Sequence, residues 1–363
     1  MKIVHISPTY FAPLSLIGGG ERYALDLALS MSHVIDTTFV SFGSSRKAYS
    51  CGSLKIELYP AKCLTKADIA NPISLRYLNS ILKFDVIHIH QINAIVSDLA
   101  CLFAFFTRKR IFASDHGGGS GITLNNLLPI SNCYRKVIAY SDFGKNILAA
   151  HIKEKTVVIK GGVDTKKFCP LMELKKQKKI IYVGRILPHK GIDYLIEGYR
   201  LLKRPDYKLV IIGPTYNRPY CEKLHQMSRG LDVEFAGEVD EKRLLFEYRT
   251  AMLTILPSVH IDYHGNYAIA PELMGLVLLE SQACGTPVVC TDAGGMCEFV
   301  SQDQTGFVIK QNSPTDIAAA IKKILALSPH EYCEYQNRCV KQAALFSWPG
   351  IVRRYLDIYR NGG

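Results

Sequence analysis

The chain has 363 residues, of which 48% are hydrophobic and 21% are charged, a composition that excludes a disordered or low-complexity protein. At about 100–200 residues per domain, this length predicts two domains. The formal net charge of +12 suits an anionic membrane surface or a phosphate-bearing substrate. Nucleic acid is not indicated, because no zinc-finger, KH or RNP-like pattern and no basic stripe interleaved with aromatics accompanies the charge.

The first half of the chain is predicted to form a parallel α/β domain. Short β-branched runs alternate with longer amphipathic stretches, the pattern of a parallel sheet covered by helices on both faces. A glycine-rich turn follows the first strand and precedes a helix over residues 21–32. The predicted strands are residues 2–7, 37–42, 85–90, 110–115, 136–141 and 156–161.

The same pattern starts again after a lysine-rich stretch, residues 175–179. Helices are predicted over residues 191–202 and 314–327, and residues 348–361 form a last amphipathic helix. We therefore place a first domain at residues 1–172 and a second at 178–347. The strands predicted in the second domain are residues 179–184, 208–213, 233–237, 253–258, 287–292 and 306–310.

No targeting or membrane-spanning segment is evident. The start, MKIVHISPTY, lacks the apolar run of about 7–15 residues found in a signal peptide. The longest apolar window, residues 92–106, is shorter than the ~20 residues that cross a bilayer. We expect a cytoplasmic protein whose 11 cysteines, which show no metal-ligand spacing, stay reduced.

Two glutamates lie eight residues apart, in a stretch that follows a predicted strand. Glu272 precedes a helix that begins near Gly275, and Glu280 lies inside that helix. The first backbone N–H groups of the helix, at Gly275, Leu276 and Val277, would form an anion site. Glu280 is four residues beyond Leu276, on the same face and about 6 Å along the helix axis at 1.5 Å per residue. This is a reasonable offset between a phosphate and the ribose of one nucleotide. The alternative is a solvated glutamate pair.

A second group follows the strand at residues 179–184. Arg185 comes directly after Gly184, where its planar fork can grip a phosphate, and Lys190 adds a point charge. Such a pair can neutralise a departing diphosphate without a metal. The alternative is a surface arginine beside a lysine at the entry of a helix.

A third group is glycine-rich. Gly19 and Gly20 follow Ile17 and Gly18 at the start of the first helix and allow a ligand to approach the backbone. The spacing is not GxGxxG, which argues against a dinucleotide. The alternative is a plain turn and helix cap.

Histidines follow or lie in two strands of the first domain. His116 lies beyond the strand at residues 110–115, beside further glycines, and can hydrogen-bond a reacting sugar or serve a structural role. His88 and His90 share one face of a strand and are interpreted as core packing. The sequence contains no HExxH motif, Walker loop or Ser/His/Asp set. No metal ligand set is predicted.

Taken together, these motifs resemble the retaining glycosyltransferases of family 4. The resemblance rests on GGGER, DHGGG, VIAYSDFGKNIL, GGVDTKKFCP, IIYVGRILPHKGIDYLI, KLVIIG, VEFAGEV, LPS, the E-x7-E pair and ACGTPVVCTDAGGMCEFV. It covers nearly the whole chain in order, and its motifs are most specific in the second half. It implies the GT-B fold, two Rossmann-like doubly wound parallel-sheet domains facing each other across a cleft that holds the active site.

The resemblance also implies roles for the residues singled out above. The first domain would bind the acceptor and the second a nucleotide sugar, with Arg185 and Lys190 on the diphosphate and Glu280 on the ribose. Glu272 and the Gly275–Val277 amides would lie at the sugar and phosphate. His116 would contact the transferred sugar, and Gly19 and Gly20 would lie by the phosphates or the acceptor. No divalent metal or other cofactor is implied, and the final helix, residues 348–363, would pack back on the first domain.

The sequence departs from the family pattern in one segment. Thirteen residues, 259–271, separate Ser258 from Glu272, whereas most relatives place this glutamate a few residues after the serine. Four aromatic or histidine side chains of this insert either shape the sugar or acceptor pocket or merely decorate a loop: His260, Tyr263, His264 and Tyr267. The usual Pro-Phe-Gly after the first glutamate is Leu273-Met274-Gly275 here.

Charge suggests a class of acceptor. Residues 1–173 carry 20 Lys/Arg against 12 Asp/Glu, whereas residues 180–363 carry 20 of each. The basic Arg108-Lys109-Arg110 after CLFAFF suits docking to an anionic leaflet, and a lipid-linked saccharide or lipopolysaccharide core is then the acceptor class. Alternatively the basic residues only confer solubility. The rival functions are a nucleotide-sugar-binding partner without transfer activity and a nucleotide-sugar epimerase or phosphorylase on the same fold.

Overall fold

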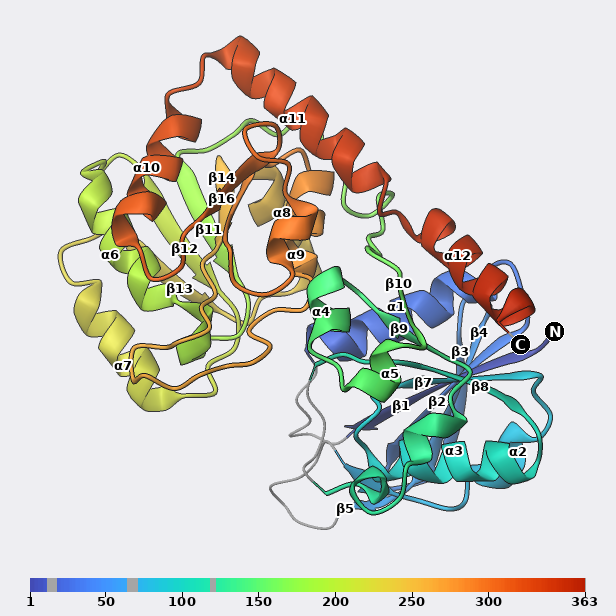
Figure 1. Ribbon diagram of the computed structural model, residues 1–363. Helices are drawn as coiled ribbons and strands as arrows, with labels where there is room; N and C mark the ends of the chain where they lie inside the picture. Colours follow the sequence, from blue (N-terminus) through green and yellow to red (C-terminus); the bar gives the residue numbers. More distant parts are fainter. Residues whose placement is uncertain (12–17, 64–70, 118–121, 363) are drawn as a thin grey trace. The chain divides into compact units, whose positions relative to one another are not determined.

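The computed structural model divides the chain into two compact units. The first comprises Met1–Gly162 and Trp348–Gly363, and the second Val163–Ser347 (Figure 1). The structure describes residues 1–11, 18–63, 71–117 and 122–362. Ile17 and the glycines at 118 and 119, which were part of the predicted motifs, lie outside the described residues.

The first unit is built on an eight-stranded sheet with the order β10-β9-β8-β7-β1-β2-β4-β3. All neighbours in it pair in parallel except β3 and β4, which form an antiparallel hairpin at one edge. The six predicted strands of this half are present, but the hairpin was not predicted. The strands are β1 (Ile3–Phe11), β2 (Thr37–Gly43), β3 (Lys47–Cys51), β4 (Leu54–Pro60), β7 (Val86–His90), β8 (Arg110–Ser114), β9 (Lys136–Ala139) and β10 (Thr156–Val158), and a separate small pair is formed by β5 (Lys62–Cys63) and β6 (Pro72–Ile73).

The two faces of this sheet bury different side chains. Val4 and Ile6 point into a hydrophobic core shared with α2 and α3. His5, between them, points to the other face, where α1 and α12 pack. This alternation follows from the two-residue period of a strand. The helices are α1 (Gly19–Ser32), α2 (Leu78–Ile81), α3 (Ile95–Phe106), α4 (Asp142–Asn146), α5 (Ala150–Lys153) and α12 (Trp348–Asn361), with 3₁₀ turns η1 (Leu124–Asn126) and η2 (Ile130–Cys133).

The second unit is built on a six-stranded, fully parallel sheet with the order β13-β12-β11-β14-β15-β16. The chain order reverses between β11 and β14, and in open α/β sheets ligands bind beyond the carboxyl ends of the strands at such a point. All six strands agree with the prediction. They are β11 (Lys179–Val183), β12 (Lys208–Ile212), β13 (Val233–Gly237), β14 (Leu253–Leu256), β15 (Val288–Thr291) and β16 (Gly306–Ile309).

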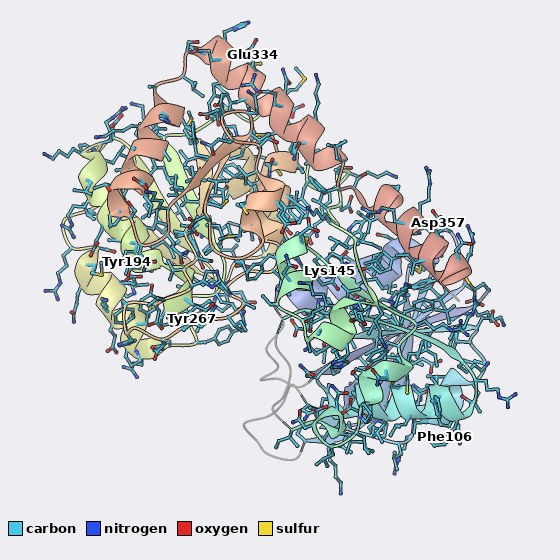
Figure 2. All side chains as sticks on the ribbon, in the orientation of Figure 1. Phe106, Lys145, Tyr194, Tyr267, Glu334 and Asp357 are labelled. Atoms are coloured by element: carbon cyan, nitrogen blue, oxygen red, sulfur yellow. The ribbon has the colours of Figure 1, made fainter. Side chains whose placement is uncertain are left out.

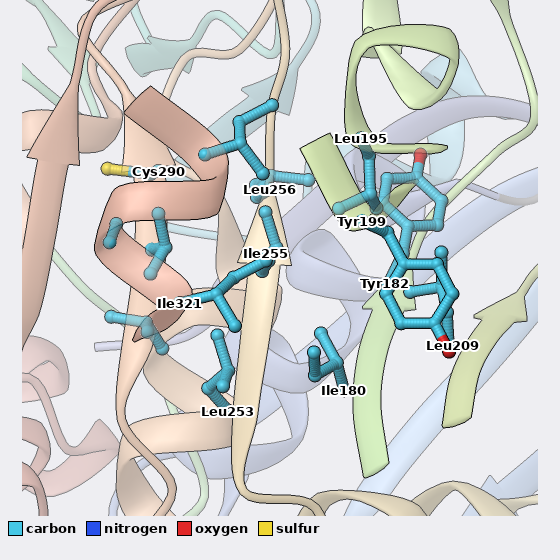
Figure 3. Packing of buried hydrophobic residues seen from close by; sticks show 14 of the residues in the cluster. Ile180, Tyr182, Leu195, Tyr199, Leu209, Leu253, Ile255, Leu256, Cys290 and Ile321 are labelled. Atoms are coloured by element: carbon cyan, nitrogen blue, oxygen red, sulfur yellow. The ribbon is translucent and has the colours of Figure 1, made fainter. Parts of the chain in front are cut away.

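The core of the second unit lies between this sheet and its helices. Figure 3 shows Leu195 and Tyr199 of α6 and Ile321 of α10 against the side chains of β11 and β14. Gly198 lets α6 and α10 approach closely, since a Cβ there would lie 2.6 Å from Ile317. The helices are α6 (Ile192–Leu202), α7 (Arg218–Met227), α8 (Glu241–Thr250), α9 (Leu276–Ala283), α10 (Pro314–Leu325) and α11 (Pro329–Ala344), with 3₁₀ turns η3 (Pro188–Lys190) and η4 (Met296–Phe299).

The last helix, α12, packs on the first unit. Tyr355 and Tyr359 are buried there, whereas Asp357 on the same helix points outward (Figure 2). Gly162 has φ +126°, and a Cβ there would lie 2.6 Å from both Trp348 and Tyr23. Only glycine therefore fits at this position beside the two rings.

The second unit begins about ten residues before the predicted end of the first domain. Residues after Val163 pack on α8: the Phe168 ring lies edge-on to Tyr248, and Arg249 donates to the carbonyl of Cys169 at 2.8 Å. Val163 also pairs with Ser347. These contacts join residues that are about 80 or more positions apart, so no local sequence pattern indicates them. The lysine-rich stretch therefore precedes the first strand of the second sheet but does not lie at the boundary between the two units.

Candidate functional site

Lys190 and Glu272 form an ion pair in the second unit. The ammonium group of Lys190 donates to the Glu272 carboxylate and, at 3.0 Å, to the carbonyl oxygen of Pro271. The Lys190 side chain is only 6% exposed and that of Glu272 20%. Sequence reasoning assigned these residues to separate motifs, and the fold brings them together.

The turn that carries Lys190 requires a glycine. Gly191 has φ +64°, and a Cβ there would lie 2.1 Å from the carbonyl oxygen of Pro257, at the end of β14. No side chain fits in that space. The turn after β11 is therefore pressed against the end of β14, which places Lys190 at the point where the strand order reverses.

Arg185 follows the end of β11 and is exposed. The tight strand end before it is held by the Tyr182 hydroxyl, which donates to the Arg185 carbonyl at 2.8 Å, and by Gly213, where a Cβ would lie 2.0 Å from the Gly184 carbonyl oxygen. Gly184 itself has φ +153°. The side chain of Arg185 is thus exposed at a tightly held strand end.

The charges of Arg185 and Glu272 shift the pKa values of the same two neighbouring side chains, His189 and Tyr182. Burial lowers the pKa of His189 to about 4, and the positive charges of Lys190 and Arg185 act in the same direction, against Glu272. Burial also raises the pKa of Tyr182 well above its usual value, and the Glu272 charge adds to this effect while Arg185 opposes it. Arg185, Lys190 and Glu272 therefore belong to one electrostatic site.

Helix α9 begins directly after Gly275, as predicted. Gly275 has φ +80° and forms the N-cap, so Leu276 and Val277 provide backbone N–H groups of the first turn. Glu280 lies within the helix and is only 4% exposed. Its carboxylate accepts a hydrogen bond of 2.8 Å from the hydroxyl of Tyr248 in α8, a partner that no motif indicated.

The Glu272 segment is fastened to the loop after β15. Gly295 donates its N–H to the Glu272 carbonyl at 3.0 Å. At Gly294, with φ +68°, a Cβ would lie 2.1 Å from the same oxygen. The two glycines of the TDAGG sequence thus hold the backbone of Glu272 in place.

The 259–271 insert also touches this loop. His260 Nδ1 bonds the carbonyl of Ala268 at 2.9 Å, which closes the insert, and its Nε2 accepts from the Gly294 N–H at 3.3 Å. Tyr267 stacks on His260 and is 68% exposed. The insert is therefore tied to the backbone that holds Glu272.

The rest of the insert is held by aromatic stacking. Tyr263 stacks on Tyr220 of α7 with ring centroids 5.3 Å apart, and the Lys223 ammonium lies 3.3 Å from the Tyr263 ring centroid. His264 packs on Tyr263 at 3.7 Å. These contacts hold the insert against α7.

In the first unit, Gly20 and His116 are neighbours. Gly20 lies in the first turn of α1, and a Cβ there would lie 3.1 Å from the His116 Cβ and 3.2 Å from its Nδ1. Gly19 is exposed beside it, and the N–H of Gly18 donates to the Glu21 carboxylate at 2.8 Å, which caps the helix. The glycine motif and the histidine motif thus lie side by side at this helix end.

His116 continues into a chain of buried histidines. His90 Nδ1 lies 3.1 Å from His116 Nε2, and His90 Nε2 lies 2.9 Å from His5 Nδ1. The Tyr140 hydroxyl also lies 3.0 Å from His116 Nε2. Burial lowers the pKa of His5 and of His116 to about 3 and that of His90 well below its usual value, so all three rings are neutral near pH 7.

His88 joins the same buried cluster through a separate branch. Its Nε2 bonds the Ser114 hydroxyl at 2.9 Å and its Nδ1 bonds the Tyr359 hydroxyl of α12 at 2.8 Å. His88 and His90 are buried, as predicted, but they are also hydrogen-bonded. His5, His88 and His90 place ligand atoms within 4.8 Å of one another, a spacing that a metal ion accepts, yet every one of these ring nitrogens already has a protein partner.

In the part of the chain that the structure describes, no helix combines the length and the apolar character of a membrane span. The cysteines among the described residues are not joined by disulfides.

Comparison with curated proteins finds glycosyltransferases. The chain is 32% identical over 188 residues to a glycosyltransferase of Methanocaldococcus jannaschii, which covers 51% of this chain and 45% of that protein. It is 30% identical over 192 residues to D-inositol 3-phosphate glycosyltransferase 2 of Catenulispora acidiphila, which covers 50% of this chain and 42% of that protein. The matched segments thus span less than half the length of these relatives.

Solved structures share the fold over the whole chain. The Anabaena protein HepE in complex with UDP has a TM-score of 0.76 at 19% identity, covering 99% of this chain and 100% of that chain. Sucrose-phosphate synthase of Thermosynechococcus elongatus has a TM-score of 0.74 at 20% identity, covering 99% and 98%. At these identities the likeness concerns the fold, which is the GT-B type with two Rossmann-like parallel-sheet domains, as predicted.

Sequence models of two families match consecutive parts of the chain. The model described as "Glycosyltransferase Family 4" matches residues 17–167, and the model described as "Glycosyl transferases group 1" matches residues 164–346. The second match alone covers half of the chain. The chain therefore belongs to the group 1 glycosyltransferases of glycosyltransferase family 4.

Proposed function

We propose that this protein is a retaining glycosyltransferase that transfers a hexose-type sugar from a nucleotide-sugar donor to a saccharide or lipid-linked saccharide acceptor. The product is an α-glycosidic bond, and the pathway is the assembly of a bacterial cell-surface polysaccharide or glycolipid. The observation that carries the proposal is the buried Lys190 paired with Glu272 at the switch point of the second sheet, beside the exposed Arg185.

The donor is proposed to bind to the second unit. Arg185 and Lys190 meet the diphosphate, the amides at Gly275–Val277 meet phosphate or sugar oxygens, and Glu280 accepts hydrogen bonds from the ribose. Glu272, which already holds Lys190, accepts hydrogen bonds from the sugar. HepE is described in complexes with UDP and with UDP-glucose, and we extend that class of donor to this chain on the strength of the shared fold.

The chemistry that these residues supply is charge stabilisation. When the bond from the sugar to the diphosphate breaks, negative charge develops on the leaving phosphate. Arg185, Lys190 and the N-terminus of α9 favour that charge, because all three present fixed positive ends to it. The acceptor hydroxyl oxygen bonds to the reacting carbon of the sugar on the same face, and the leaving phosphate takes the proton of that hydroxyl. No divalent metal enters this proposal, and His116 contacts the transferred sugar.

A non-catalytic nucleotide-sugar-binding partner is the second candidate function. It would need the donor site but not the sugar contact in the first unit. The presence of His116 and Gly20 side by side at a helix end, together with Lys190 and Glu272, favours transfer over binding alone. An epimerase on this fold would convert the donor without any acceptor.

The acceptor class follows from the surface of the first unit. Phe105 and Phe106 at the end of α3 are 61% and 78% exposed, and Phe106 lies at the outer edge of its unit in Figure 2. Arg110 donates to the Tyr359 carbonyl at 2.9 Å and Lys109 to that of Phe84 at 3.0 Å, so two cations of the basic triplet also serve the fold.

Further apolar side chains are exposed on elements that contact α3. Both α2 and η1 contact α3. We propose that this surface rests on an anionic membrane leaflet and meets a lipid-linked acceptor there. The exposed side chains are Leu82, Phe105, Phe106, Leu127 and Leu128, here called the α3 surface.

The donor is tested by thermal unfolding with UDP-, GDP-, ADP- and dTDP-linked sugars in the presence of EDTA. A ligand at 100 times its Kd stabilises by about 2.7 kcal/mol, a shift that is easily measured. One clear hit is expected, and it should vanish in Arg185→Ala but persist in Arg218→Ala, whose side chain is 89% exposed on α7. Retention is then read from the anomeric configuration of the product by NMR. No stabilisation by any of these sugars contradicts the donor proposal, and a β-linked product contradicts retention.

A further inference from the structure

The chain of histidines behind His116 has a definite direction. It ends at Met31, where His5 Nε2 lies 3.4 Å from the thioether sulfur. A thioether sulfur has no proton and accepts only weakly, so His5 must carry its proton on Nε2 if this contact is a hydrogen bond. A neutral imidazole carries one proton, which leaves His5 Nδ1 as an acceptor.

The remaining protons follow in turn. Because His5 Nδ1 accepts, His90 Nε2, at 2.9 Å, must donate to it. His90 Nδ1 is then without a proton and accepts from His116 Nε2 at 3.1 Å. Each step relies on neutral rings, and the burial that lowers the pKa of all three histidines keeps them neutral.

The other polar groups around His116 fit this arrangement. The Tyr140 hydroxyl lies 3.0 Å from His116 Nε2, and its oxygen can share the same proton as an acceptor. His88 does not interrupt the chain, because its two nitrogens are bonded to Ser114 and Tyr359.

With its proton on Nε2, His116 has an unprotonated Nδ1 that can accept a hydrogen bond. Nδ1 faces the first turn of α1, where a Cβ on Gly20 would lie 3.2 Å from it. We propose that His5 and His90 are positioning residues that fix the Nε2–H tautomer of His116, so that Nδ1 accepts a hydrogen bond from a hydroxyl of the transferred sugar. This inference rests on the proposed function only for the identity of the hydroxyl.

The tautomer is tested without any substrate. In protein labelled with ¹⁵N-histidine, long-range ¹H–¹⁵N correlation spectra distinguish Nε2–H from Nδ1–H rings. The His116 signals are assigned by their loss in His116→Gln. We expect an Nε2–H ring at His116 in the wild type and in His90→Asn, whose side-chain oxygen can take the place of Nδ1. In His90→Gln the side-chain amide can donate to His5 in place of His90 Nε2, but no group replaces His90 Nδ1 as the acceptor for His116. We therefore expect His116 to lose its preference for the Nε2–H tautomer in this variant.

The consequence for the sugar is tested with the nucleotide sugar that stabilises the wild type most in the UDP, GDP, ADP and dTDP panel. His90→Gln should lower its turnover about 3- to 10-fold, the effect of one hydrogen bond, while the Kd of the matching nucleoside diphosphate stays unchanged. His90→Asn should restore most of the turnover. A merely structural role of His90 would instead affect both ligands or neither.

Three results would overturn the inference. The first is an Nδ1–H or doubly protonated His116 in the wild type. The second is a His90→Gln variant with unchanged tautomer and turnover. The third is a stoichiometric divalent metal in the purified protein that His5→Gln removes, since a metal would occupy the ring nitrogens. If no nucleotide or nucleotide sugar binds the wild type, the proposed function fails, and the NMR measurement still decides the tautomer.

Discussion

Lys190 and Glu272 are joined by an ion pair although 82 residues separate them in the chain. Lys190 also donates to the carbonyl of Pro271, so two oxygens hold the buried ammonium group. A buried ammonium is stable only with such partners. The pair therefore keeps a positive charge in place at the carboxyl end of the sheet before any ligand arrives.

Removing one partner of this pair should destabilise the protein. We expect Glu272→Gln to lower the free energy of unfolding by about 2 kcal/mol, because it leaves Lys190 buried without its anion. In the double variant Lys190→Met/Glu272→Gln the loss should be smaller than the sum of the single losses. Denaturant unfolding measures both effects.

The matched control for that cycle is the exposed pair of Lys178 and Asp206, whose side chains are 65% and 38% exposed. Asp206→Asn should lower stability much less than Glu272→Gln, since exposed ion pairs contribute little. Additive losses at Lys190 and Glu272 would show that the two side chains do not depend on each other.

Gly191 is predicted to be intolerant of a side chain. Gly191→Ala should destabilise the second unit by well over 1 kcal/mol, because it combines a left-handed φ of +64° with a Cβ 2.1 Å from the Pro257 carbonyl. Gly230→Ala is the control: its φ is +75°, but no atom lies within 4 Å of the added Cβ. It should cost only the backbone strain, about 1 kcal/mol. Equal melting temperatures for the two variants would contradict the close approach of the turn to β14.

Stability should fall as the pH drops below about 6.5. The folded-state pKa of His5 and of His116 is lowered from 6.5 to about 3, so below pH 6.5 the unfolded state binds more protons than the folded state. The free energy of unfolding therefore rises with pH between about 3 and 6.5, by up to about 1.4 kcal/mol per pH unit for each such histidine.

One carboxyl group opposes this trend. Burial raises the pKa of Asp115 to about 6, so its protonation favours the folded state between about pH 4 and 6. Since several histidines are lowered and they outweigh one aspartate, the net effect between pH 7 and 5 should still be destabilising. Urea unfolding at pH 7, 6 and 5 measures it, and a stability that does not change over this range would contradict the neutral buried histidines.

The α3 surface should bind anionic vesicles. We expect Phe105→Ser/Phe106→Ser to weaken sedimentation with phosphatidylglycerol vesicles at least 10-fold, since each buried phenyl ring contributes about 2 kcal/mol. Leu345→Ser, an exposed apolar residue of the second unit with 73% exposure, should have no effect. Binding that is equal for anionic and zwitterionic vesicles would contradict the contribution of the basic residues.

The sequence alone determined the elements and their layers, because a strand or helix is marked by the local period of its apolar side chains. All twelve predicted strands are present, and α9 begins after Gly275 as its glycine and following apolar run indicated. A strand with no buried side chain lacks that signal. The hairpin of β3 and β4 was missed because the side chains of β3 are exposed throughout.

Only the tertiary structure decided which of the motif residues meet. Lys190 reaches Glu272 and His90 reaches His116 because parallel strands end at the same edge of a sheet. Tyr248 of α8 reaches Glu280 of α9 because these two helices are in contact. The direction of the hydrogen bonds behind His116 depends in turn on Met31, on another element. No local pattern encodes a partner that the chain reaches only after folding.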